Sequence, residues 1–243
     1  MRQFLGVVVI FCHFLSLSVA ADLDLRNVVR QEQLELPEIV DGNLNLSSLY
    51  SLQDIILSKE VHGDLFLSNL FTADTIFFPE KLSGNLYVES LQNAKDLVLP
   101  QEIGGGVYFD RLEKINELTF PLLMVSDIHL PALVEIEKLE FPKVVGGSLN
   151  ISKLKSLKGV TLPDEVRKNL NISGIDPEFV TVLPKRVGGD LFIESVSNIE
   201  KIRLPEYIGG DIYISKIKKI DKGILPEDFS GQIYVMPFPN FSF

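Results

Sequence analysis

The chain has 243 residues, a formal net charge of -10 at pH 7, 17 glycines, 13 prolines and a single cysteine. The acidic balance argues against nucleic acid and anionic membrane surfaces as partners, because both repel a negatively charged protein. One cysteine also excludes a disulfide within the chain.

Residues 1–21 have the composition of an export signal. Arg2 is followed by an apolar run from Phe4 to Leu17 and then by small residues up to Ala21, an order typical of a secretory signal peptide. We expect cleavage after Ala20 or Ala21, and a secreted, extracellular or cell-surface location, or the periplasm of a Gram-negative bacterium. The run is shorter than the ~20 apolar residues of a membrane helix, so no membrane span is expected in the mature chain. Cys12 lies in this signal, which leaves the exported chain without a thiolate nucleophile or metal ligand.

From Leu36 onward the sequence repeats every 21 residues without insertion or deletion. Pro follows the apolar residue that opens each frame, except at Ser58. A unit of this kind buries its apolar face only by stacking on its neighbours. We therefore expect a solenoid over 22–235, with a half-turn at 22–35 and a C-terminal cap at 236–243. The ten frames open at Leu36, Leu57, Phe78, Leu99, Phe120, Phe141, Leu162, Leu183, Leu204 and Leu225.

Periodicity within a frame predicts its local structure. Positions 9 and 11 are apolar in all ten frames, which indicates a short strand with two inward side chains. Apolar residues then recur at every third position, as in a tight 3₁₀-like arc, and an alternating pair closes the frame. We expect two strands per turn in a mainly β, single-domain, right-handed solenoid of ten 21-residue turns, either leucine-rich-repeat-like or a parallel β-helix. At ~4.8 Å per turn the rod would be ~48 Å long.

A corner that recurs in most frames precedes the first strand. Gly occupies position 7 in eight frames, which favours either a positive φ or a close approach of two backbones. Position 8 is mostly Asn or Asp, which we interpret as turn residues. A calcium ion between Asp190 and Asp211 is an alternative that we weigh less, because calcium needs many oxygen ligands. We expect no metal and no cofactor.

Position 10 points outward between the two inward residues of the strand, and it carries a ring in seven of ten frames. Such a column can simply stabilise the sheet through cross-strand pairs. It can also form a ligand face, since exposed rings rimmed by polar groups mark interaction sites. Neighbouring acids such as Asp64, Asp127 and Glu194 favour a neutral-polar, glycan-like or basic ligand. The predicted ligand-binding residues are Phe66, Tyr87, Tyr108, His129, Phe192, Tyr213 and Tyr234.

Asparagines and two irregular frames interrupt this column. Asn45, Asn150 and Asn171 occupy position 10 and form N-x-S sequons with the serine of the repeat, and a fourth sequon lies at Asn240. The fifth frame replaces the glycine pair by Val125-Ser126, and the seventh has Arg167-Lys168 there and Pro177 in its arc. Drift under relaxed packing explains both frames; the alternative is that they shape the face around His129.

The stretch Leu149-Asn150-Ile151-Ser152-Lys153-Leu154-Lys155-Ser156-Leu157 resembles the short leucine-rich repeats of bacterial surface and secreted proteins. This chain departs from that family because leucines such as Leu70 and Leu154 stand where the family has a buried asparagine. With its G-G-[DN]-L corner it is also similar to the L domains of cell-surface receptors. Both resemblances imply a module for recognition.

The sequence as a whole predicts a non-catalytic recognition protein that binds an extracellular protein or a glycan and is a monomer. A structural spacer or surface-layer component is the alternative. An enzyme acting on polysaccharide is a weaker third interpretation, because catalytic clefts on solenoids need loops that interrupt the period. The mature chain also has only His62 and His129 as histidines and no cysteine.

Overall fold

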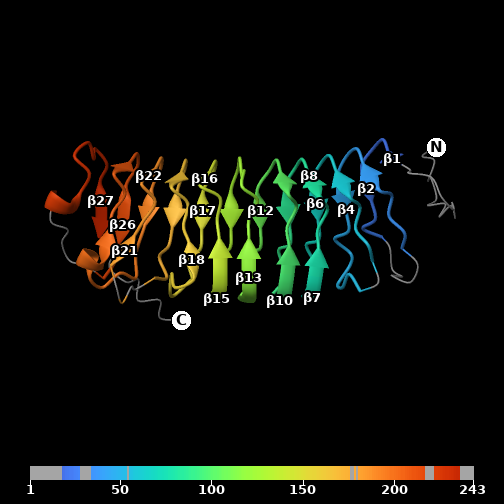
Figure 1. Cartoon of the computed structure of the whole chain (residues 1–243), viewed down its shortest axis with the longest axis horizontal. Coiled ribbons are helices and arrows are strands. Elements are labelled where there is room, and N and C mark those ends of the chain that lie inside the picture. The colour runs from blue at the N-terminus through green and yellow to red at the C-terminus, as the bar shows by residue number, and fades with distance from the viewer. Residues whose placement is uncertain are drawn as a thin grey trace, which may run out of the picture.

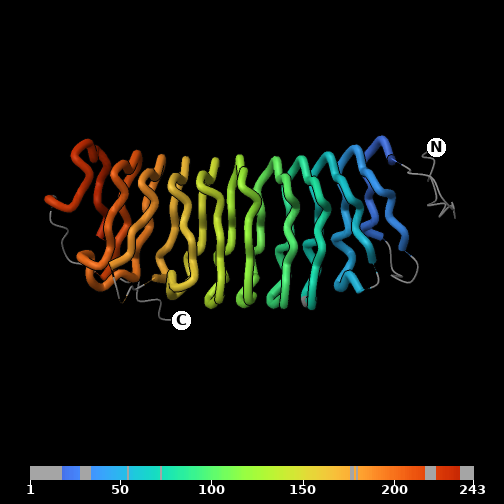
Figure 2. The backbone as a smooth tube through the Cα atoms, viewed as in Figure 1, coloured from blue at the N-terminus to red at the C-terminus, as the bar shows by residue number. Residues whose placement is uncertain are grey.

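The structure is a computed structural model that describes residues 18–27, 34–53, 55–175, 178, 180–216 and 222–235. These residues form a parallel β-solenoid, a single elongated domain of about ten stacked turns without an α-helix in the described part (Figure 1). Each 21-residue frame makes one coil, and the coils are numbered here from coil 1 at Leu36. Figure 2 shows them side by side along the rod. The predicted fold class is confirmed.

The first face of the rod is built from positions 4 and 5 of each coil. Its strands are short and form two sheets, which isolated bridges from Met124 to Ile103 and Val145 connect. The strands are β1 (Ser18–Val19), β3 (Ile39–Val40), β5 (Glu60–Val61), β8 (Lys81–Leu82), β11 (Glu102–Ile103), β16 (Val144–Val145), β19 (Glu165–Val166), β22 (Arg186–Val187) and β25 (Tyr207–Ile208).

The second face runs the whole length of the described rod as one 11-stranded sheet. Each residue pairs with the residue one period later, as Leu44 does with Leu65. The strands are β2 (Leu23–Asp24), β4 (Leu44–Asn45), β6 (Leu65–Phe66), β9 (Leu86–Tyr87), β12 (Val107–Tyr108), β14 (Ile128–His129), β17 (Leu149–Asn150), β20 (Leu170–Asn171), β23 (Leu191–Phe192), β26 (Ile212–Ile214) and β27 (Ile233–Val235).

The third face closes each frame and is less regular. One sheet spans coils 2 to 6, a separate pair of strands spans coils 7 and 8, and two 3₁₀ helices complete the described part. The elements are β7 (Thr72–Phe77), β10 (Asn93–Val98), β13 (Lys114–Thr119), β15 (Glu135–Glu140), β18 (Val160–Thr161), β21 (Thr181–Val182), η1 (Ile199–Lys201), β24 (Ile202–Arg203) and η2 (Lys222–Ile224).

Two sequence predictions about the coil need correction or refinement. The frame contains three strands rather than the predicted two. The additional strand, at positions 4 and 5, is only two residues long and therefore shows no alternation in the sequence. The 3₁₀-like arc is confirmed at its start, where Leu49 N donates to Leu46 O at 3.0 Å, and again in coil 8, where η1 forms. In coils 2 to 5 the remainder of the arc is extended and forms six-residue strands.

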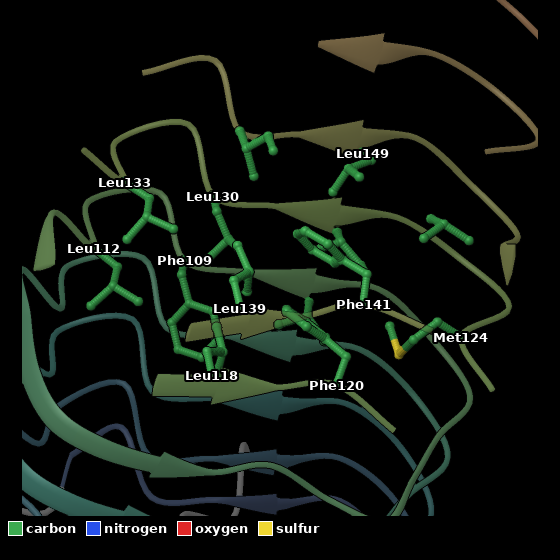
Figure 3. Packing of buried hydrophobic residues seen from close by; sticks show 14 of the residues in the cluster. Phe109, Leu112, Leu118, Phe120, Met124, Leu130, Leu133, Leu139, Phe141 and Leu149 are labelled. Atoms are coloured by element: carbon green, nitrogen blue, oxygen red, sulfur yellow. The ribbon is translucent and has the colours of Figure 1, made fainter. Parts of the chain in front are cut away.

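A continuous column of Leu, Ile, Val and Phe fills the interior, as Figure 3 shows for the middle coils. Positions 5, 9, 11 and 14 supply most of it, with position 20 from the third face. Phe109 is the largest fully buried side chain and contacts Phe78 edge to face at a centroid distance of 6.3 Å. The only buried polar residue among those described is Ser58, which breaks the proline column.

The ends of the rod bear on the predicted boundaries. Leu23 pairs with Leu44, and β1 extends the coil pattern to Ser18 and Val19, whereas residues 28–33 of the predicted half-turn at 22–35 lie outside the described residues. The predicted cap at 236–243 lies outside the described residues. No helix in the described part of the chain is long and apolar enough to cross a membrane.

The recurring glycines serve close approach between coils. Among the described glycines a positive φ occurs only at Gly159, so the positive-φ explanation is wrong for position 7. A Cβ at Gly105 would lie 2.5 Å from Asn85 Oδ1 and 2.6 Å from the backbone of Gly84. At Gly105 the next coil can therefore stack this closely only because a side chain is absent.

Candidate functional site: the aromatic ridge and its polar border

The position-8 side chains tie neighbouring coils together beside the second face. Asn43 Oδ1 accepts a hydrogen bond of 2.7 Å from Asp64 N, and Asp64 Oδ1 accepts one of 2.7 Å from Asn85 N. The same bond recurs along the rod. It is missing at Gly106, which has no side-chain oxygen, and at Ser148 it is long, with Oγ accepting from Asn169 N at 3.4 Å. Our interpretation of position 8 as local turn chemistry is therefore wrong, since the oxygens bind the next coil. The other acceptors are Asp22, Asn85, Asp127, Asn169, Asp190 and Asp211.

These hydrogen bonds use one carboxylate oxygen of each aspartate in the pair that could hold calcium. Asp190 Oδ1 accepts from Asp211 N at 2.8 Å, and Asp211 Oδ1 accepts from Gln232 N at 2.7 Å. No group of three potential metal ligands occurs among the residues that the structure describes. The geometry at this border gives the calcium alternative no support.

The first block of the aromatic ridge lies on β6, β9, β12 and β14. Phe66 and Tyr87 stack with centroids 4.9 Å apart and planes 6° from parallel, and Tyr87 and Tyr108 stack at 5.0 Å and 11°. His129 continues the column at 6.2 Å from Tyr108 but tilts by 46°. Parallel strands in register bring residues 21 apart in the sequence into direct ring contact.

The second block lies on β23, β26 and β27. Phe192 and Tyr213 stack at 4.5 Å and 11°, and Tyr213 and Tyr234 at 5.0 Å and 14°. Asn150 and Asn171 separate the blocks on the neighbouring strands β17 and β20. The structure thus brings all seven predicted ring residues onto one face, in two groups.

Stacking also decides which part of each ring is accessible. Six of the seven ridge side chains are half-buried, and Tyr234 at the end of the described rod is 40% exposed. Because neighbouring rings cover one another's faces, the ridge presents ring edges and phenol oxygens to solvent. A partner would therefore meet edges and hydroxyl groups rather than open aromatic faces.

Carboxylates border the phenol oxygens. Partial burial raises the pKa of Tyr87 above its ordinary value of 10.0, and the negative charges of Asp64 and Glu89 add to this. Burial likewise raises the pKa of Tyr108, together with Asp127, whose Oδ2 accepts a 3.5 Å hydrogen bond from the phenol. The ridge is thus flanked by negative charge, and it favours a partner that brings hydrogen-bond donors or cations.

His129 and the ridge asparagines are held by local contacts. His129 Nε2 lies 3.6 Å from Asp110 Oδ1, and its Nδ1 lies 3.5 Å from Asn150 Nδ2. Oδ1 of each ridge asparagine accepts from the amide of the serine two residues later at 3.1 Å. The three described sequon asparagines, Asn45, Asn150 and Asn171, are therefore half-buried parts of the strand face.

Comparisons with protein-family models, curated proteins and solved structures give no match. The relationship to other proteins is accordingly limited to the architecture, a β-solenoid of stacked 21-residue coils.

The raised tyrosine pKa values predict a pH dependence. A phenol whose pKa is higher in the folded state resists deprotonation there, so its contribution to stability is fully present below pH 10 and is lost as the pH rises through the folded pKa. Tyr213 follows the same direction through loss of hydration and the charges of Asp190 and Asp211. Tyrosinate absorbance of the folded protein should therefore titrate at higher pH than that of the protein unfolded in guanidinium. Coincident titration curves would contradict the burial and charge described for these phenols.

Proposed function

We propose that this protein is a secreted or cell-surface recognition protein without catalytic activity, which binds an extracellular protein or a glycan through the aromatic ridge. The observation that carries the proposal is the pair of in-register ring stacks on one face, with phenol oxygens and carboxylates along their edge. Aromatic residues at a surface combine large contact area with little loss of side-chain entropy on binding.

The chemistry of the ridge favours one kind of partner surface. Its carboxylates and phenol oxygens accept hydrogen bonds, so lysine or arginine side chains or sugar hydroxyl groups complement them. The resemblance to short leucine-rich repeats and receptor L domains, both used mainly for recognition, is consistent with this proposal.

A structural spacer is the second candidate, and ring stacking favours it. Each stacked pair stabilises neighbouring coils by about 0.5–1.5 kcal/mol, which alone would explain rings at position 10. The two functions differ in one respect: a spacer needs the ridge only for stability, whereas a recognition protein needs it for binding.

The proposal predicts that binding depends on the ridge and not on exposed rings elsewhere. Residues 22–243 would be screened against glycans and extracellular proteins beside a Phe66→Ser, Tyr87→Ser, Tyr108→Ser variant. The matched control is Tyr50→Ser, Phe71→Ser, Phe77→Ser, which removes three rings that are 68%, 47% and 70% exposed off the ridge.

We expect the ridge variant to lose binding by about a hundredfold or more, as for truncation of aromatic hot spots, and the control variant to retain it. Circular dichroism and a thermal melt establish that both variants are folded at the temperature of the assay. Binding that survives in the folded ridge variant would refute the ridge as the site. A complete absence of binding by the wild-type protein would favour the spacer.

A further inference from the structure

The third face of the rod is interrupted between coils 6 and 7. β18 pairs with β15 on one side, with Val160 opposite Leu139. β21 pairs with β24, with Thr181 opposite Ile202. β18 and β21 are one period apart, yet they belong to separate sheets. Figure 1 shows both strands on the lower side of the rod, at the point where the regular series from β7 to β15 ends. Two strand edges therefore face each other without pairing.

Backbone hydrogen bonds agree with the interruption that the separate sheets show, although one bond of this kind, from Leu99 N to Thr119 O, is also absent between the paired and described strands β10 and β13. Phe120 N donates to Glu140 O at 2.9 Å, and Phe141 N donates to Thr161 O at 3.2 Å. The next bond of the series would join Leu162 N to Val182 O, and it is absent among the described residues. The series resumes at Leu183 N and Arg203 O, at 3.1 Å. Unsatisfied edge groups of this kind are templates for an added strand.

A groove occupies the interruption. It has a volume of about 810 Å³, within the range of about 300–1,000 Å³ typical of ligand sites. Its apolar lining comprises Leu157 and Val160 of coil 6 and Ile175, Val182 and Leu183 of the coils that follow. Val182 is 57% exposed even though it is apolar, so the groove offers an apolar surface beside two open strand edges.

The cations of the groove differ from those of the first coils. Lys59, Lys81 and Lys114 each contact a glutamate of a neighbouring coil. Three lysines that line the groove have no carboxylate within 4.0 Å among the described residues, although Asp164 and Glu178 also line it. These lysines are Lys155, Lys158 and Lys185.

The two halves of the chain also differ in their balance of acidic and basic side chains. Residues 22–140 contain 21 acidic and 8 basic side chains, whereas residues 141–243 contain 12 and 14. The groove therefore lies in the half of an acidic protein where cations outnumber acids. An anionic partner is attracted to this half and repelled by the other.

We propose that this groove binds an extended, acidic peptide segment of a partner protein, which adds as a strand between β18 and β21. The main chain of the segment would pair with the open edges at Leu162 and Val182, as in other cases of strand addition. Alternate side chains would contact the apolar lining, and carboxylates would bind the lysines through charge-assisted hydrogen bonds. This site lies on the third face and is independent of the ridge on the second.

A selection from a library of short random peptides displayed on phage tests the proposal, with the immobilised protein as bait. Selected peptides are then titrated against Lys155→Glu, Lys158→Glu. The matched control is Lys143→Glu, Lys153→Glu, which makes the same change in net charge in the same coil with lysines outside the groove lining. All four lysines are exposed, so both variants should fold.

We expect selected sequences that alternate apolar and acidic residues, and about tenfold or greater loss of affinity for the groove variant only. A peptide N-methylated at alternate residues should not bind, since it lacks the main-chain donors of an added strand. A library that yields no binder, or binders that are equally affected by both variants, would overturn the site. Undiminished binding of the N-methylated peptide would overturn strand addition.

Discussion

Replacing Gly105 with serine is expected to destabilise the rod by roughly 1–3 kcal/mol, the usual range for overpacking. The added Cβ would overlap Asn85 Oδ1 of the preceding coil, at 2.5 Å, and the Gly84 backbone. Chemical denaturation followed by circular dichroism would measure the loss.

The sequence itself indicates a second substitution that should compensate for the loss of Gly105. Position 7 is not glycine at Ser126 and Lys168, and in both cases position 8 of the preceding coil is not Asn or Asp but Gly106 or Ser148. The double variant Asn85→Gly, Gly105→Ser reproduces the pair found at coils 4 and 5. We expect its loss of unfolding free energy to be smaller, by about 0.5–3 kcal/mol, than the sum of the losses in the two single variants, which is the usual coupling between residues in contact. Strictly additive effects would contradict the steric explanation.

Replacing Phe109 with alanine is expected to have the second large effect. Its side chain is fully buried, and loss of a buried phenylalanine costs about 3–5 kcal/mol. The matched control is Phe109→Leu, because Leu46, Leu67 and Leu130 fill the same position in other coils. Leucine should cost much less than alanine.

Hydrogen exchange would show which coils the Phe109→Ala substitution destabilises. Each coil of a solenoid contacts mainly its neighbours, so amides of coils 3 to 5 should exchange faster while those of coils 8 and 9 change little. Uniform acceleration over the whole rod would contradict this local cooperativity and indicate that all coils unfold as one unit.

The period was sufficient to predict the solenoid, because ten frames without insertion force each coil to stack on the next. The alternation of Leu44 and Leu46 around an outward residue also predicted the sheet that carries the ridge. The strand at positions 4 and 5 was missed because two residues give no periodic signal, and its apolar residue is a single inward contact such as Val61.

The contacts between coils were the harder part to predict. Position 8 looked like local turn chemistry because Asn and Asp are common in turns, whereas its oxygens bind the amide one coil later. The pairing of glycine with a preceding Asn or Asp was visible in the sequence at Ser126 and Lys168, where both partners change together. That signal could have indicated a contact between residues 20 apart in the sequence.

The candidate sites differ in how far they could be predicted. Every ring of the ridge follows from position 10, although the stacking that hides the ring faces depends on rotamers that the pattern does not specify. The groove could not be predicted, since it arises where β18 and β21 fail to pair. The irregular seventh frame with Pro177 was the available signal, and we interpreted it chiefly as drift.

The affinity of a Tyr87→Phe, Tyr108→Phe variant for the ligand found in the screen tests the central claim most directly. Phenylalanine keeps both rings and therefore the stacks that stabilise the coils, and removes only the phenol oxygens at the exposed edge. Loss of two hydrogen bonds of roughly 0.5–1.5 kcal/mol each predicts an affinity about five- to 150-fold weaker, with little change in melting temperature, since the only hydrogen bond of these phenols within the described part of the protein is the 3.5 Å contact of Tyr108 with Asp127. Unchanged affinity would contradict recognition through the polar edge of the ridge.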